Sequence, residues 1–138
     1  MREILFRGKT KDTKWWIEGY YAIESNHACF QSELKHTHFI FKDEFMDWGI
    51  GGLVQYEVIS KTVGQYTGLT DKNGKRIYEG DIVCFHGTLY NEIFPIVFAD
   101  GCFRLGTKNG YSYTLQNLCS ALEVIGNIHD NPELLKGE

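Results

Sequence analysis

The chain has 138 residues, of which 43% are hydrophobic and 14% aromatic, with 2 prolines and 4 cysteines. This composition argues against intrinsic disorder and predicts a globular protein that forms a core without disulfides or metals. The formal net charge of −4 at pH 7 disfavours a nucleic-acid-binding protein, because such proteins usually carry a positive surface. No segment approaches the roughly 20 apolar residues of a membrane span and no apolar leader follows the N-terminus, so we expect a cytoplasmic protein without a membrane partner.

The first part of the chain predicts β-strands separated by polar turns. Apolar residues on both sides of the polar loop Gly8–Lys14 indicate an N-terminal β-hairpin. Residues 24–45 fit either two strands or a strand and a loop. A glycine-rich group then precedes Tyr56–Ile59, which predicts a strand leading into the centre of the chain.

The run from residue 64 to residue 83 is the most informative segment, because its glycines and turn residues dictate backbone shape. Asn73 and Gly74 both tolerate positive φ, so they predict a type I′ hairpin turn. Asp71 is placed to start this turn by a forward hydrogen bond from its side chain.

A second turn follows at Glu79-Gly80-Asp81, ahead of the apolar strand Ile82–Phe85. The two carboxylates of this turn are interpreted as caps of backbone amides rather than as a catalytic pair. A Gly-Asp step before β-branched residues is common at the first strand of small SH3-like barrels. We therefore expect SH3-like barrel character over about residues 64–105.

The remainder predicts a β-meander, with hairpin turns at Asp100-Gly101 and at Lys108–Gly110. A last strand is expected at Leu122–Ile128. Asn131 as N-cap and Pro132 at the first helical position then predict one or two turns of helix. The whole chain is thus expected to form one mainly β domain over residues 1–138, built of meandering antiparallel sheets with a short C-terminal helix.

Several stretches resemble the YopX-like family of bacteriophage and prophage proteins. They are Arg2–Gly8, Trp16–Gly19, Thr62–Val83, Leu122–Ile128 and Asn131–Leu135. The similarity spans nearly the whole chain, although residues 23–60 carry little of it. The resemblance implies a small β-rich protein that assembles into homo-oligomers, and it supplies neither an established activity nor catalytic residues.

One group of side chains permits a metal site. His27 and Cys29, and likewise His36 and His38, lie two residues apart, so each pair shares a strand face, and a hairpin would bring both pairs together as four zinc ligands. The spacing matches no established zinc signature, so ordinary hydrogen bonding is the favoured interpretation. We predict no metal and no other cofactor.

Catalytic motifs are missing from the sequence. It contains no Gly-x-Ser-x-Gly elbow, no Cys-x-x-Cys pair and no glycine-rich loop ending in Lys-Ser or Lys-Thr. We therefore predict no catalytic residues and a protein that acts by binding rather than as an enzyme.

Aromatic and basic side chains supply the candidate binding surface. Adjacent Trp15 and Trp16 point to opposite sides of a strand, so one of them leaves the core. Exposed aromatic side chains suit protein interfaces, which favours self-association and a host or phage protein as partner. The alternative is a nucleic-acid-binding module in which a basic turn lies next to stacking tyrosines. The candidate residues are Trp15, Trp16, Tyr66, Lys72, Lys75, Arg76 and Tyr78.

Overall fold

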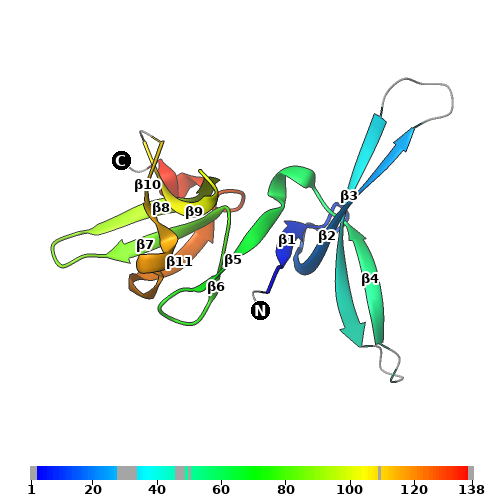
Figure 1. The fold of residues 1–138 in the computed structure, drawn as a ribbon, viewed down its shortest axis with the longest axis horizontal. Coiled ribbons are helices and arrows are strands. Elements are labelled where there is room, and N and C mark those ends of the chain that lie inside the picture. Colours follow the sequence, from blue (N-terminus) through cyan, green and yellow to red (C-terminus); the bar gives the residue numbers. More distant parts are fainter. Residues whose placement is uncertain (1–2, 28–33, 46–48, 50, 109, 137–138) are drawn as a thin grey trace. The chain divides into compact units, whose positions relative to one another are not determined.

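The computed structural model describes residues 3–27, 34–45, 49, 51–108 and 110–136 (Figure 1). These residues are mainly β-strand, arranged in antiparallel sheets with short 3-10 helices, which confirms the expected fold class. The chain divides into two compact units: an N-terminal unit, Glu3–Gln65, and a C-terminal unit that contains Tyr66–Glu138.

The N-terminal unit is built on a sheet in which long neighbouring strands follow one another along the chain (Figure 1). Of the range left open by the sequence, residues 24–27 and 34–45 belong to two strands. The strands pair in the order β4-β3-β2-β1-β5. They are β1 (Phe6–Lys9), β2 (Trp16–His27), β3 (Leu34–Phe45), β4 (Gly51–Glu57) and the start of β5 (Gly64–Thr70), with the 3-10 helix η1 (Ser60–Thr62) before β5.

The core of the N-terminal unit centres on Ile40 and Val58, which are both buried. Glycine allows β2 and β3 to come close there. A Cβ atom on Gly19 would lie 2.2 Å from the carbonyl oxygen of Phe41 and 3.0 Å from the side chain of Ile40. The absence of a side chain at residue 19 is therefore required by the packing of this hairpin.

The C-terminal unit contains the end of β5, which pairs with β6 (Arg76–Tyr78), and a five-stranded sheet in the order β10-β9-β8-β7-β11. Strands β7 to β10 form the predicted meander, and β11 returns to pair with β7 (Figure 1). The elements are β7 (Asp81–His86), β8 (Asn91–Ala99), β9 (Cys102–Thr107), β10 (Gly110–Thr114), η2 (Leu115–Asn117), η3 (Cys119–Ala121), β11 (Leu122–Asn127) and η4 (Pro132–Leu135).

A second hydrophobic core lies within the C-terminal unit. Its buried residues come from β6 to β9, from η2 and from β11. Burial of this kind of aliphatic side chain stabilises a fold by about 1.5–3 kcal/mol per residue. The core residues are Ile77, Val83, Ile96, Leu105, Leu115 and Leu122.

The central turn differs from the predicted type I′ geometry. Gly74 has a positive φ of 82°, but Asn73 does not. The amide of Gly74 donates to the carbonyl of Asp71 at 3.0 Å, and the amide of Asp71 donates to the carbonyl of Lys75 at 2.8 Å. The type I′ prediction is therefore wrong, and the loop is a three-residue connection with a single left-handed glycine at its end.

Two further predictions on local structure have different outcomes. Asp100 and Gly101 have positive φ values of 52° and 79°, which agrees with a two-residue hairpin turn. The C-terminal helix is a 3-10 helix, Pro132–Leu135, with proline in its first turn. The side chain of Asn131 does not cap this helix. Its Oδ1 instead accepts a hydrogen bond from the backbone amide of Asn127 at 3.3 Å.

Candidate binding surfaces

One side of the N-terminal sheet collects large apolar side chains. Strand register places Tyr20 opposite Phe41 and Asp43 opposite Leu53, so alternate residues of β2, β3 and β4 share a face. Tyr20 is 57% exposed and Leu53 is 59% exposed. We call this surface the aromatic face, and it consists of Trp16, Tyr20, Phe39, Phe41 and Leu53.

The two adjacent tryptophans have different environments, as the sequence predicts. Trp15 is 73% exposed, whereas Trp16 is half-buried. The guanidinium of Arg7 lies 4.8 Å from the centroid of the Trp16 ring, and the ammonium of Lys9 lies 5.6 Å from it. The candidate residues predicted from the sequence do not include these two cations, although their i, i+2 spacing next to Phe6 is typical of a strand that presents both on one face.

The central turn brings together only part of the predicted basic and aromatic set. The guanidinium of Arg76 lies 5.5 Å over the ring of Tyr66, and the rings of Tyr66 and Tyr78 are 5.6 Å apart. Tyr78 is only 4% exposed, so it packs against Tyr66 and contributes little to the binding surface. Lys75 is exposed.

Lys72 lies in a mixed cluster of charges. Its ammonium is 3.6 Å from Glu123 Oε2, and the same oxygen is 2.8 Å from His86 Nε2. The hydrogen bond from His86, followed by the charge of Lys72, lowers the pKa of the Glu123 carboxyl. This carboxylate offsets the positive charge beside the turn, which makes the surface less suited to a phosphate backbone.

Asp71 organises the turn from a buried position. Its Oδ1 accepts hydrogen bonds from the amides of Asn73 and Lys75, each at 2.9 Å. Its Oδ2 accepts one from the amide of Val124, also at 2.9 Å. Burial alone would raise the pKa of this carboxyl, but the three backbone donors, with the charge of Lys75, hold it below its ordinary value.

The four residues of the zinc alternative are only partly described. Cys29 lies outside the described residues, and so does the side chain of His27. His36 Nδ1 is 2.8 Å from the hydroxyl of Ser25, and His38 Nδ1 is hydrogen-bonded to the hydroxyl of Tyr21. Within the part of the chain that the structure describes, no three His, Cys, Asp or Glu side chains gather as metal ligands.

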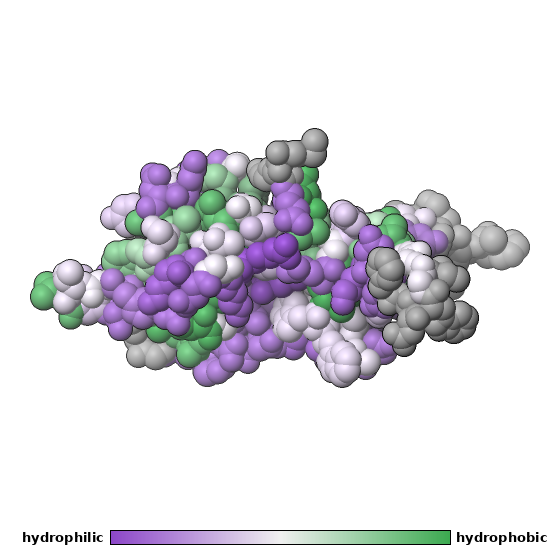
Figure 2. All heavy atoms as spheres, turned by 90° about the horizontal axis from the view of Figure 1, so that it is seen from below, coloured by the Kyte–Doolittle hydropathy of each residue, from purple (hydrophilic) through white to green (hydrophobic). Residues whose placement is uncertain are grey.

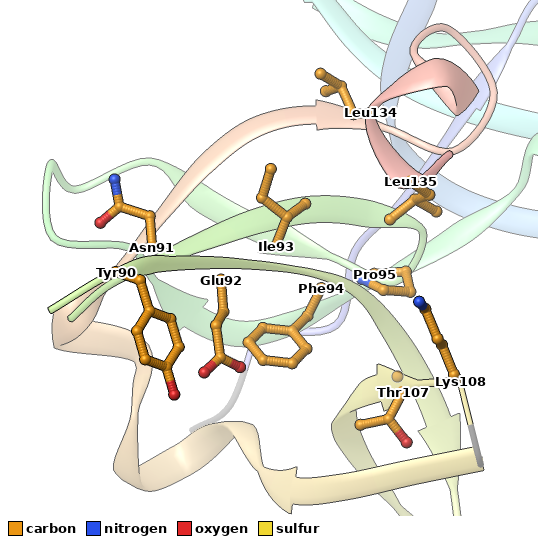
Figure 3. A pocket seen from close by; sticks show the side chains of 11 residues that line it. Tyr90, Asn91, Glu92, Ile93, Phe94, Pro95, Thr107, Lys108, Leu134 and Leu135 are labelled. Carbon is orange, nitrogen blue, oxygen red and sulfur yellow. The ribbon is translucent and has the colours of Figure 1, made fainter. Parts of the chain in front are cut away.

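The C-terminal unit contains a groove that the sequence analysis did not identify (Figure 3). It has a volume of about 690 Å³ and is bounded by β8, by the end of β9 with the following turn, and by η4. Figure 2 shows that hydrophobic side chains interrupt the hydrophilic surface of this unit. The sequence signal was Pro95, because proline within a strand marks an edge.

The YopX protein family model matches residues 5–136. The chain belongs to the YopX family. A crystal structure of protein EF1440 from Enterococcus faecalis is similar to it, with a TM-score of 0.57 and 26% sequence identity over 98% of this chain and 99% of that chain. No curated protein matches the chain.

Within this YopX-family chain, the family match runs through both compact units. The aromatic face, the central turn and the groove beside β8 therefore all lie within the matched residues.

In the described ranges, no helix has the length and apolar character needed to cross a membrane.

Proposed function

We propose that this YopX-family chain is a phage or prophage accessory protein that acts by binding other proteins in the host cytoplasm. Self-association through the aromatic face is part of the proposal. The observation that carries it is the exposure of Tyr20 and Leu53 on one side of the N-terminal sheet, next to the half-buried Phe39 and Phe41. Large exposed apolar side chains that gather on one sheet face are typical of protein interfaces.

The environment of Trp15 and Trp16, at the start of β2, supports the same proposal. Trp15 is exposed, and Trp16 lies beneath two cationic side chains. Tryptophan, tyrosine and arginine are the residues that contribute most to binding energy at protein interfaces. The net charge of −4 fits a protein partner better than it fits a nucleic acid.

The topology of the C-terminal unit supports its interpretation as an SH3-like barrel. Strands β7 to β10 follow one another as a meander, two 3-10 helices follow β10, and β11 then pairs with β7. On such a fold, function depends on the surface residues and not on the topology alone.

Measurement of mass in solution tests the self-association. Multi-angle light scattering should give wild-type protein a multiple of 15.9 kDa, and the double variant Tyr20→Ser/Leu53→Ser should shift toward the monomer. Gln55→Ser is the matched control, because Gln55 is an exposed polar residue of the same strand and face as Leu53. A monomeric wild-type protein, or a double variant of unchanged mass, would contradict the proposal.

The stacking of Arg76 on Tyr66 favours a second candidate function, the binding of single-stranded nucleic acid. Fluorescence anisotropy with a labelled oligonucleotide tests it. Binding that falls steeply with salt and is weakened by Lys75→Glu would support this function. Binding that is absent at low salt would eliminate it.

A further inference from the structure

Strand β8 has an open edge over its first half. Residues 91–95 pair with β7 on one side, and β9 pairs on the other side only with Ile96–Ala99. In the described part of the chain, no strand pairs with the outer edge of Asn91–Pro95. An open edge of this kind presents backbone donors and acceptors to a further strand.

The direction of these backbone groups follows from the hairpin at the end of β8. Ala99 and Cys102 close the two-residue turn, so they form the hydrogen-bonded pair, and every second residue back along β8 points its backbone groups the same way. The carbonyl of Ile96 confirms this alternation, because it accepts from the amide of Gly80 on the opposite side, at 2.9 Å. Ile93 therefore directs both its N–H and its C=O to the open edge.

Proline at residue 95 agrees with this assignment. Residue 95 shares the outward direction of Ile93, and proline, which has no N–H, is tolerated in a strand where that donor is not needed for pairing. The open edge thus offers one donor and one acceptor at Ile93.

Side chains from both faces of β8 turn this edge into a groove. Figure 3 shows Leu134 and Leu135 of η4 on the side of Ile93 and Pro95, and Tyr90 and Phe94 on the other side. Because the edge lies inside this groove, a single extended strand has better access to it than the edge of another folded sheet. The volume of about 690 Å³ lies within the range of sites that enclose ligands, roughly 300–1,000 Å³.

Charges of opposite sign mark the two ends of the groove. Glu92 lies near its start, and Lys108 lies at the end occupied by Pro95 (Figure 3). An occupant that is complementary to this arrangement has apolar side chains in its middle and a carboxylate near Lys108.

We propose that the groove beside β8 binds an extended peptide segment of a partner protein, which adds to the sheet as a further strand. The peptide pairs with the backbone of Ile93 and places an acidic residue near Lys108. This mode takes its affinity from main-chain hydrogen bonds and its specificity from alternate side chains. The inference rests on the proposed protein-binding role by naming the class of partner, and it does not use the aromatic face.

A display experiment followed by backbone modification tests this proposal. A phage-displayed library of random decapeptides is selected on the full-length chain, and the enriched peptide is synthesised with a fluorescent label. A series with one N-methyl group at each amide in turn is then measured by fluorescence polarisation. N-methylation should weaken binding by about tenfold at every second amide near the centre and little at the amides between them.

Variants of the protein identify the site. Ile93→Pro removes the outward N–H and should weaken peptide binding to a similar extent. Lys108→Glu should weaken the binding of an acidic peptide by about threefold or more. Lys61→Glu is the matched control, since Lys61 is an exposed lysine of the N-terminal unit. If Ile93→Pro does not fold, the N-methyl series on the wild-type protein still decides the question.

Several outcomes would overturn the inference. They are a library without enriched sequences, an N-methyl series without alternation, and a peptide that binds a folded Ile93→Pro variant as well as wild type. Because Tyr20→Ser/Leu53→Ser leaves the groove intact, that variant should retain the peptide. Failure of self-association and failure of peptide binding are thus separate results.

Discussion

The carboxylate of Asp71 is joined to Val124 by a hydrogen bond of 2.9 Å from the backbone amide of Val124, across 53 positions of sequence. The same side chain holds the amides of the central turn. One buried carboxylate therefore fixes the turn between β5 and β6 to β11, the last strand of the chain's described part.

Replacement of Asp71 by alanine should lower the free energy of unfolding by about 2–4 kcal/mol, because three backbone amides lose a charged acceptor that is itself buried. Urea denaturation followed by circular dichroism measures this change. Asp43→Ala, at an exposed site of the N-terminal unit, is the control and should change stability by less than about 0.5 kcal/mol. A similar loss in both variants would contradict this role of Asp71.

The stability of the C-terminal unit should also depend on pH through Asp71. Its pKa is lower in the folded than in the unfolded chain, so the carboxylate contributes its full stabilisation above about pH 4 and loses it as the pH falls through the lowered pKa. Denaturation midpoints measured from pH 7 down to pH 2 should fall less steeply for Asp71→Asn than for wild type. Parallel curves would refute the linkage.

Alanine at residue 19 should destabilise the N-terminal unit. Its Cβ would lie 2.2 Å from the carbonyl oxygen of Phe41, and forced displacement in a packed region costs about 1–3 kcal/mol. Gly52→Ala is the matched control, because a Cβ there meets no atom within 4 Å. Thermal melting should separate the two variants, and equal melting temperatures would show that β2 and β3 do not approach so closely.

The central turn should tolerate alanine at residue 73 better than at residue 74. Only Gly74 has positive φ, so Gly74→Ala should cost about 1 kcal/mol through backbone strain, while Asn73→Ala avoids this cost. Urea denaturation of both variants measures the difference. An equal loss of stability in the two variants would favour the type I′ turn, which needs positive φ at both residues.

Cys84 should react more slowly with iodoacetamide than Cys119. Cys84 is buried in β7, and burial, followed by the charge of Glu123, raises the pKa of its thiol. Cys119 is partly exposed in η3. Peptide mass mapping after timed alkylation at pH 8 gives both rates, and faster labelling of Cys84 would show that β7 opens readily.

Local sequence signals predicted the features that depend on a few neighbouring residues. The alternation at Trp15 and Trp16 and the two-residue turn at Asp100-Gly101 needed no knowledge of the rest of the fold. The type I′ prediction at Asn73 failed because the Asp71 side chain holds the amides of Asn73 and Lys75, which favours a longer loop with one left-handed residue. The turn propensity of Asn73 alone does not indicate these hydrogen bonds to Asp71.

Long-range pairing limited the prediction of the site. The groove beside β8 exists because β9 leaves the edge of β8 at Ile96 and η4 lies beside it, and these elements are distant in sequence. Pro95 was visible as a sign of an edge, but the sequence does not show which elements flank that edge. The aromatic face likewise depends on the register of three strands, which residue types between 24 and 57 leave open.

The pairing of β7 with β11 sets an order of events during synthesis on the ribosome. Every strand segment of the N-terminal unit is present once Gln65 has emerged, so this unit can fold while the rest is still being made. Strand β7, by contrast, gains its second neighbour only when Leu122–Asn127 appears. Until then, the nascent C-terminal unit has an unpaired β7 edge, which is the stage at which a chaperone or a premature contact with another chain has most access to it.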